Sequence, residues 1–380
     1  MAERARSIDT LRGTVMVLMV LDHARDFFAG FGMNPTDLAT TTVPLFCTRW
    51  VTHFCAPVFV LLAGTAAYLH SRKHGLRQTR RFLFTRGLWL IFLELTVVRF
   101  AWVPDPSYHY SVLQVIWALG WSMLALSLLS YLPTRAVVLS GALIALLHNL
   151  LDPIDHRQLS ASVEPIWDLL HEPASLHWGT RSVYVAYPIF PWIGVMALGF
   201  GLGQLFELPI VERRRWLLRL GLGAVFGFLV LRGLNGYGDP YPWSVSARGP
   251  AFTLFSFLNC QKYPPSLAYL LMTLGPALLA LRALEKASAR LVAPLELVGR
   301  VPLFFYIAHL YLLRFTAAPL AALRFGKSAF TPPPGHAGSP ELGLWAAYAA
   351  WAVALAILYP LCRWFARKKA ASRSPWLSYL

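Results

Sequence analysis

The chain alternates between long apolar runs and short polar connections. About ten of the runs have the length that an α-helix needs to cross a bilayer, roughly 20 residues at 1.5 Å per residue. This pattern predicts an all-α fold, a polytopic helical bundle integral to a membrane. The predicted spans are residues 8–30, 46–70, 82–103, 110–131, 135–151, 187–207, 214–232, 265–283, 299–322 and 344–365.

Two charged clusters bracket the first apolar run, residues 14–21. At about 100° per residue, one stripe of this helix carries ionisable groups at both of its ends. The stripe comprises Asp9, Arg12, Met16, Met19, His23 and Asp26. Arg12 and His23 stand about 16 Å apart along the axis, so a basic group lies near one membrane surface and an imidazole near the other. A simple anchoring helix with charges at both interfaces is the alternative for this segment alone.

Composition also indicates an integral membrane protein. Of the 380 residues, 57% are hydrophobic and 14% are charged, and the mean hydropathy is +0.51. Soluble proteins do not carry that much apolar surface. The four cysteines lie in or beside apolar segments without metal-ligand spacing, so we expect neither a disulfide framework nor a zinc site. No small-residue cleavage site follows the first run, so we do not interpret it as a signal peptide.

The net charge of +16 is distributed in short basic clusters between apolar runs, which favours membrane orientation signals over nucleic-acid binding. Basic residues concentrate in 72–81, 213–215, 282–300 and 363–369, all on the same side as the N-terminus. The alternate connections, 31–45, 104–109, 152–186, 233–264 and 323–343, are poor in them. We therefore expect both termini in the cytoplasm and the protein in the cytoplasmic (inner) membrane.

The predicted outer connections are longer and richer in Pro, Gly, Trp and Tyr than the inner ones. Residues 153–187 and 233–265 are candidates for a cap over an outward-facing site, with aromatic rings available to stack on sugars. An interfacial aromatic belt explains the same residues equally well. No linker, low-complexity stretch or clear repeat interrupts the chain, so residues 1–380 are expected to form one domain.

Ionisable side chains within the predicted spans each cost at least about 2.5 kcal/mol at the bilayer centre unless they are paired or line a cavity. His23 lies toward the outer end of the first span, where Asp22 and Asp26 are near enough to orient or charge it. Arg49 and His53 lie four residues apart on one face of the second span.

Two further ionisable residues lie near the middle of later spans. Glu94 needs a partner such as Arg99 or an imidazole, and His309 follows Tyr306 by three residues. Each histidine alone is explained by a hydrogen bond between helices, but histidines from three spans together indicate a polar pocket. The histidines in the spans lack the spacing of a metal-ligand motif, and no Gly-x-Ser-x-Gly is present, so we expect neither a metal site nor a serine nucleophile.

Six motifs along the chain resemble the bacterial branch of the heparan-α-glucosaminide N-acetyltransferase family, within the transmembrane acyltransferase superfamily. The first two, RSIDTLRG and LDHARDFF, occupy residues 6–13 and 21–28. The others are residues 52–64, 187–194, 262–267 and 299–309. They cover the chain from end to end, in order.

The resemblance implies an enzyme that takes acetyl groups from cytoplasmic acetyl-CoA and passes them to an amino or hydroxyl group of an extracytoplasmic sugar or glycan. Oligomers are common in such families, and no metal cofactor is implied. Arg12 with Asp9, and more weakly Arg300, are the residues expected to hold the CoA phosphates. Asp26, Glu94 and Lys262 are the residues assigned to the acceptor.

Acyl transfer needs a base for the incoming nucleophile or a nucleophile that takes the acyl group itself, and neutral imidazole can serve as either. His23, oriented by Asp22 or Asp26, is the first candidate, while His53 or His309 would stabilise the oxyanion or act as a second base. Eukaryotic members of the family carry Asn at the position of Asp22 and a catalytic His where this chain has Val43. Direct transfer and an acetyl-histidine intermediate therefore both remain open.

A transporter or channel is the alternative function, with the same buried His, Asp and Glu residues forming a proton or substrate pathway. Helices broken by Gly or Pro at matching places in two halves would favour it, and the sequence does not have them. A purely structural membrane protein leaves the charged stripe of residues 9–26 unexplained.

Overall fold

The computed structural model describes residues 6–30, 34–330 and 338–372. Both ends of the chain and parts of the predicted connections 31–45 and 323–343 lie outside these ranges. The chain divides into two compact units, which we describe separately. Of the described residues, the histidine unit comprises those within 6–55, 244–259 and 283–372, and the sheet unit comprises 56–243 and 260–282.

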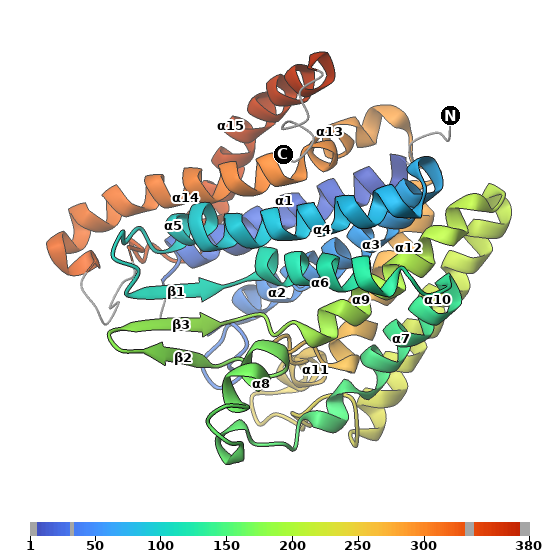
Figure 1. The fold of residues 1–380 in the computed structure, drawn as a ribbon. Coiled ribbons are helices and arrows are strands. Elements are labelled where there is room, and N and C mark those ends of the chain that lie inside the picture. The colour runs from blue at the N-terminus through green and yellow to red at the C-terminus, as the bar shows by residue number, and fades with distance from the viewer. Residues whose placement is uncertain (1–5, 31–33, 331–337, 373–380) are drawn as a thin grey trace. The chain divides into compact units, whose positions relative to one another are not determined.

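The histidine unit is built around its first helix, α1 (Arg6–Phe28), which packs against α13, α14, α15 and α2. The α1 helix coincides with the predicted first span. The other helices are α2 (Val43–Thr52), α11 (Pro250–Leu258), α13 (Ala289–Arg300), α14 (Pro302–Phe325) with the short η5 (Gly326–Phe330), and α15 (Leu344–Ala371) (Figure 1). Helix α1 therefore has neighbours that follow it by about 280 residues or more in the sequence, and these long-range contacts set the geometry of its charged stripe.

The sheet unit combines helices with a small three-stranded sheet. Its helices are α3 (Cys55–His74), α4 (Leu76–Leu93), α5 (Arg99–Trp102), α6 (Val115–Leu129), α7 (Thr134–Leu147), α8 (Glu164–Leu170), α9 (Phe190–Leu202), α10 (Ile210–Leu234) and α12 (Leu267–Leu284). Shorter turns are the π-helical η1 (Glu94–Val98) and the 3₁₀ turns η2 (His148–Leu151), η3 (His156–Gln158) and η4 (Gly203–Glu207).

The fold is mostly helical, as predicted, but the small sheet is an addition that the all-α prediction did not include. Strand β1 (Tyr110–Leu113) pairs in parallel with β3 (Arg181–Val185), which pairs antiparallel with β2 (Ser175–Trp178), in the order β1-β3-β2. The predicted span 110–131 thus begins as a strand, and its helix starts only at Val115. Tyr, Val and Leu are apolar in a helix or a strand, so hydropathy alone could not separate the two.

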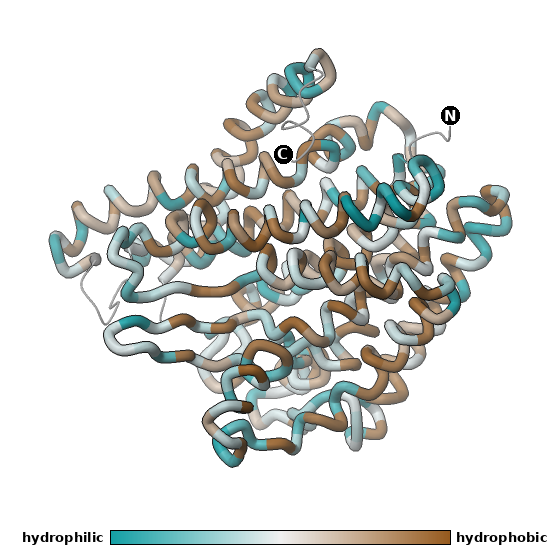
Figure 2. Tube along the Cα trace, in the orientation of Figure 1, coloured by the Kyte–Doolittle hydropathy of each residue, from teal (hydrophilic) through white to brown (hydrophobic). Residues whose placement is uncertain are grey.

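Six helical segments of the described residues are long and apolar enough to cross a membrane, and all six fall on predicted spans (Figure 2). They are Val43–His74, Thr134–Leu151, Ile210–Leu234, Leu267–Leu284, Pro302–Ala329 and Leu344–Ala371. The other four predicted spans correspond to α1, α4, α6 and α9, of which α6 and α9 have only 15 and 13 residues. A multi-pass helical membrane protein is thereby supported, whereas ten crossings and the side of each terminus remain predictions.

Two predicted spans are divided in the structure. Span 46–70 consists of α2 and α3, separated at His53 and Phe54, because Pro57 has no N–H to donate to the carbonyl of His53. Span 299–322 is interrupted at Val301, whose non-helical backbone (φ −128°, ψ 50°) precedes Pro302 at the start of α14. Arg300 consequently ends α13 rather than beginning α14.

Glycines pair reciprocally where helices within each unit come closest. In the histidine unit, a Cβ on Gly13 would lie 1.8 Å from the carbonyl oxygen of Leu295, and one on Gly299 would lie 1.8 Å from that of Asp9. The backbones of α1 and α13 are therefore in direct contact. The sheet unit repeats the arrangement at Gly64 with Gly199, Gly87 with Gly120, Gly141 with Gly194, and Gly221 with Gly275.

Candidate active site

Two buried histidines meet within the histidine unit. His23 comes from α1 and His309 from α14, and the Nδ1 atom of His23 lies 2.6 Å from Nε2 of His309. Their ring planes differ by only 8°, with centroids 4.9 Å apart, and Tyr306 packs edge-on against both rings. Two of the three predicted span histidines are thus brought together, although 286 residues separate them in the chain.

The hydrogen bonds of His309 determine where the protons of a neutral pair lie. Its Nδ1 atom lies 3.0 Å from the carbonyl oxygen of Phe305, one turn earlier in α14, and a carbonyl can only accept. Nδ1 of His309 therefore carries the proton, and its Nε2 accepts from Nδ1–H of His23. This tautomer leaves the lone pair of His23 on Nε2, which is the arrangement that a base or nucleophile requires.

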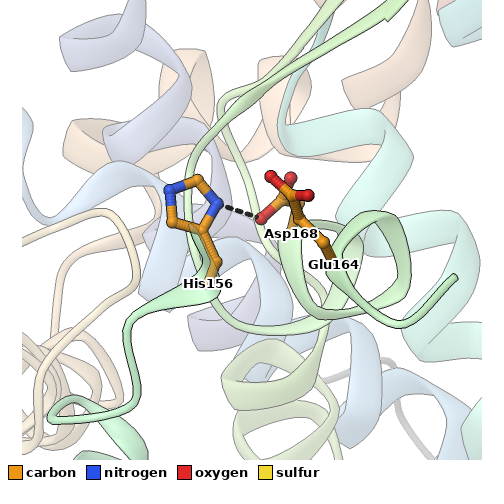
Figure 3. A group of neighbouring side chains, drawn as sticks. All are labelled: His156, Glu164 and Asp168. Carbon is orange, nitrogen blue, oxygen red and sulfur yellow. Dashed lines mark hydrogen bonds and ion pairs between the residues drawn. The ribbon is translucent and has the colours of Figure 1, made fainter. Parts of the chain in front are cut away.

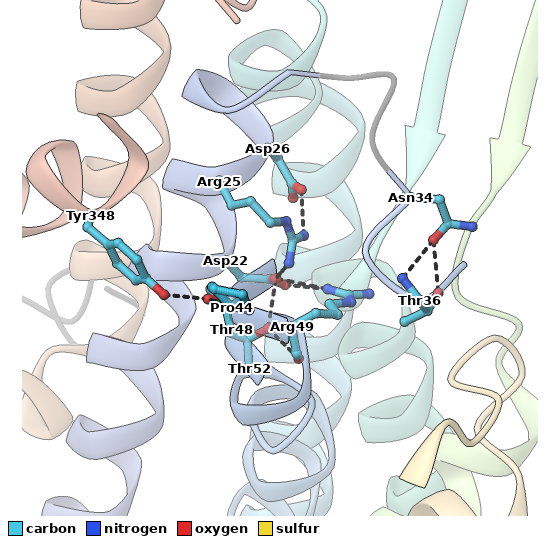
Figure 4. Close-up of polar contacts among 10 residues, drawn as sticks. All are labelled: Asp22, Arg25, Asp26, Asn34, Thr36, Pro44, Thr48, Arg49, Thr52 and Tyr348. Atoms are coloured by element: carbon cyan, nitrogen blue, oxygen red, sulfur yellow. Dashed lines mark hydrogen bonds and ion pairs between the residues drawn. The ribbon is translucent and has the colours of Figure 1, made fainter. Parts of the chain in front are cut away.

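A cluster of ion pairs centred on Asp22, the residue before His23 in the chain, joins α1 to α2 (Figure 4). Both carboxylate oxygens of Asp22 accept from Nη1 of Arg49, at 2.9 and 2.7 Å, and Nη1 of Arg25 lies 2.7 Å from the same carboxylate. The Thr52 hydroxyl donates to it as well, at 2.8 Å. Asp22 thus ties α1 to α2 with charge-assisted bonds, which are stronger than neutral ones.

Asp26 is half-buried and forms an ion pair of 2.6 Å with Arg25. Two carboxylates and two guanidinium groups therefore balance in charge within this cluster. The Nδ1 partner of His23 is an imidazole, so an orienting role for Asp22 or Asp26 stays a prediction. The binding of Arg25 and Thr52 to Asp22 was not predicted from the sequence. Arg25 was considered only as part of the motif at residues 21–28, and Thr52 carries no charge that would have drawn attention to it.

His53 is also buried and belongs to the same unit. It follows directly after α2, and its backbone N–H donates to the carbonyl of Arg49 at 3.1 Å. The structure thus places His53 at the break between α2 and α3, not inside a continuous helix. Its part in the chemistry stays a prediction.

The opposite end of the α1 stripe is a basic cluster. Nη1 of Arg12 donates to Asp9, at 3.1 Å, and to the carbonyl oxygen of Gly299, at 3.2 Å. Glu296 of α13 binds two arginines, Arg6 at 3.2 Å and Arg300. Both of these arginines are exposed, with 44% and 47% of the side chain accessible, whereas Arg12 retains only 15%.

The remaining two predicted site residues lie in the sheet unit. The Glu94 carboxylate accepts from the backbone N–H groups of Gln114, at 3.0 Å, and Trp117, at 3.2 Å, and so caps the N-terminus of α6. The expectation that Glu94 pairs with Arg99 or an imidazole was wrong. Arg99 instead donates to the carbonyl oxygens of Asp105 and Tyr110.

Lys262, the other predicted residue in this unit, is buried between two tyrosine rings. Its ammonium lies 5.1 Å from the ring centre of Tyr263 and 5.9 Å from that of Tyr187. Among the described residues, no carboxylate lies within 4.0 Å of it. Cation–π contacts with these two rings therefore stabilise the buried ammonium of Lys262.

Comparison with known proteins gives one family. The family model described as heparan-alpha-glucosaminide N-acetyltransferase, catalytic, matches residues 4–234. The matched region includes His23, the Asp22 cluster and Arg12, while His309, Arg300 and Lys262 lie beyond it. No curated protein matches the sequence.

Proposed function

The chain belongs to the heparan-alpha-glucosaminide N-acetyltransferase family, and from this premise we propose that it moves acetyl groups across the membrane. The donor in this proposal is cytoplasmic acetyl-CoA, and the acceptor is an amino or hydroxyl group of an extracytoplasmic sugar or glycan. Both units would form one acyltransferase domain in the inner membrane. Family membership favours this function over a transporter or channel.

The observation that carries the proposal is the hydrogen bond from His23 to His309. With its lone pair on Nε2, His23 can take the proton from the acceptor N–H or O–H as that group attacks the thioester carbonyl. The C–S bond then breaks, and the proton held by His23 passes to the CoA thiolate. During the step, His309 accepts from Nδ1–H of His23 and stabilises the imidazolium.

The same lone pair also permits a two-step route. Nε2 of His23 would attack the thioester carbonyl, the C–S bond would break to release the CoA thiolate, and Nε2 would hold the acetyl group. The acceptor N–H or O–H would then displace His23 from the acetyl carbon and release its proton to water. Both routes need an unprotonated Nε2, so the tautomer does not separate them. In either case His309 accepts from Nδ1–H of His23 and so stabilises a protonated or acylated imidazole. The charges of Asp22 and Asp26 are balanced by Arg25 and Arg49, and their orienting role stays a prediction.

We place the CoA phosphates at the basic end of α1. Arg6 and Arg300 are exposed there, and each can exchange its contact with Glu296 for a phosphate. Arg12, which bonds Asp9 and Gly299, would turn toward a phosphate only by giving up one of these contacts. The pantetheine arm would then follow α1 past Arg12 toward His23, which lies about 16 Å beyond Arg12 along the helix axis.

For the acceptor we retain Asp26, a half-buried carboxylate of the histidine unit. The assignment of Lys262, whose ammonium is flanked by aromatic rings in the sheet unit, stays a prediction from the sequence. Glu94 is omitted from the proposed site, because its carboxylate caps α6. His53 remains a proposed second base or oxyanion donor.

The test is release of free CoA by the purified full-length chain in detergent or vesicles, with acetyl-CoA and a panel of amino sugars. We expect release that depends on the acceptor, and weaker binding of acetyl-CoA in the double variant Arg6→Ala/Arg300→Ala. Absence of any acetyl-CoA binding by the wild-type chain would overturn the proposal and favour transport.

A further inference from the structure

A second group of chemically reactive side chains lies in the sheet unit, between α7 and β2. His156 of η3, Glu164 and Asp168 of α8 each contribute one donor atom, and these atoms all lie within 4.8 Å of one another (Figure 3). Nδ1 of His156 lies 2.8 Å from Oδ1 of Asp168. The group therefore combines one imidazole nitrogen with two carboxylates.

Local structure brings these residues together. Glu164 and Asp168 lie four residues apart, which places them on one face of α8. His156 begins η3, a turn capped by Asp155, whose carboxylate accepts from the backbone N–H of Arg157 at 3.0 Å. The capped turn η3 thus positions His156, and helix α8 positions Glu164 and Asp168.

The two carboxylates have no permanent positive charge beside them. Within the described part of the chain, no lysine or arginine lies within 4.0 Å of Glu164 or Asp168, and Arg157 is bound to Asp155 instead. Only 3% of the Asp168 side chain is exposed, and its Oδ1 atom lies 2.8 Å from Nδ1 of His156. Two neighbouring carboxylates, one of them deeply buried, repel each other unless a cation compensates them.

We propose that His156, Glu164 and Asp168 bind a divalent transition-metal ion. An imidazole nitrogen with carboxylate oxygens suits Zn²⁺ and similar ions better than Mg²⁺ or Ca²⁺, which prefer oxygen ligands alone. Zinc binds such donors at about 2.0–2.2 Å, so small rotations of three side chains that already lie within 4.8 Å of one another complete the set. Nδ1 of His156 exchanges its hydrogen bond to Asp168 for the metal.

The site is accessible to an ion from outside the unit. The side chain of His156 is 21% exposed, and Glu164 is half-buried, so a water can occupy a fourth position. The bound ion joins η3 to α8 and thereby fixes the segment 152–172. This role is independent of acetyl transfer.

The test is a zinc titration of the full-length chain, purified in detergent, stripped with a chelator and monitored by competition with a chromogenic chelator. We expect one saturable Zn²⁺ site whose affinity falls at least tenfold in His156→Gln and in Glu164→Gln. Zinc should also raise the melting temperature of the wild-type chain and leave that of both variants unchanged. Glu164→Gln keeps the size of a half-buried side chain, and its melting temperature without zinc reports whether it folds.

Three control variants separate this site from other zinc ligands. His177→Gln changes an exposed histidine of β2, and Glu172→Gln changes a nearby carboxylate outside the group. His74→Gln removes a histidine of α3 whose ring lies 4.5 Å from that of His70. All three should keep the site. Unchanged zinc affinity in both His156→Gln and Glu164→Gln, loss of the site only in His74→Gln, or no saturable binding by the wild-type chain would each overturn the proposal.

Discussion

At the scale of single residues, His309 governs the protonation of His23 without needing to touch a substrate. An acceptor atom beside Nδ1 of His23 keeps the proton there and the lone pair on Nε2. Any side chain that supplies an acceptor at the same place should therefore preserve part of the function. This distinguishes a positioning role from simple packing.

We accordingly expect His309→Ala to lower the rate of CoA release by about 10²-fold or more, in line with the contribution of general base catalysis. His309→Gln should recover part of that loss, because its amide oxygen can accept from Nδ1–H of His23. Melting temperatures of both variants provide the folding control. Equal activity in the alanine and glutamine variants would contradict the assigned role.

Glu94 leads to a stability prediction. Glu94→Ala removes the acceptor for the N–H groups that begin α6, and a buried unsatisfied donor costs about 1–3 kcal/mol. We expect a lower melting temperature in Glu94→Ala and a smaller decrease in Glu94→Gln, which keeps one oxygen. Catalytic rates at a permissive temperature should remain near those of the wild-type chain. A lower catalytic rate with an unchanged melting temperature would contradict this capping role and would support the original assignment of Glu94 to acceptor binding.

Sequence reasoning was most successful where one helix carries the information. The stripe from Asp9 to His23 follows from helical geometry, and the structure confirms the helix. The partners of Glu94 could not be predicted, because they are backbone N–H groups. Nearly every residue has such a group, so the sequence does not show which of them bind the carboxylate. His156 was also missed, since its spacing of eight and twelve residues to Glu164 and Asp168 depends on the turn between η3 and α8.

At the scale of helices, the reciprocal glycines explain how α1 is held. The glycine that ends the RSIDTLRG motif, Gly13, lies against the backbone of α13, so part of that motif serves packing. The same contact positions Arg12 against the carbonyl of Gly299.

Gly13→Ala should destabilise the protein by about 1–3 kcal/mol or more, because the new methyl group meets backbone atoms that cannot move aside. Gly223→Ala in α10 is the matched control, since a Cβ there has open space within 4 Å. It should be neutral or stabilising by up to about 1 kcal/mol. Thermal unfolding in detergent measures both, and similar melting temperatures for the two variants would contradict the packing account.

Element boundaries were less predictable than element existence. Apolar runs located the helices, but the strand β1 and the break before Pro302 lie within runs that read as continuous. Hydropathy measures burial or contact with lipid and is nearly blind to backbone geometry. Prolines give the missing signal at two helix breaks, Pro57 after the break between α2 and α3 and Pro302 at the start of α14.

At the scale of the whole molecule, the predicted orientation places the α13 end of the chain in the cytoplasm and the sheet outside. Ser288 precedes α13, and Ser175 begins β2, and both are exposed. In right-side-out vesicles, an impermeant maleimide should label Ser175→Cys and leave Ser288→Cys unlabelled, with the exposed Cys47 replaced by serine in both. Labelling of Ser288→Cys from outside would reverse the assigned topology.

The central claim is that His23 either carries the acetyl group or takes the proton of the acceptor. The most direct measurement is CoA release by His23→Ala. The exposed His177→Ala is the matched control. We predict at least about a 10²-fold loss of acceptor-dependent release in His23→Ala, with acetyl-CoA binding and melting temperature retained, and wild-type rates in His177→Ala. A folded His23→Ala protein that releases CoA at the wild-type rate would contradict the account.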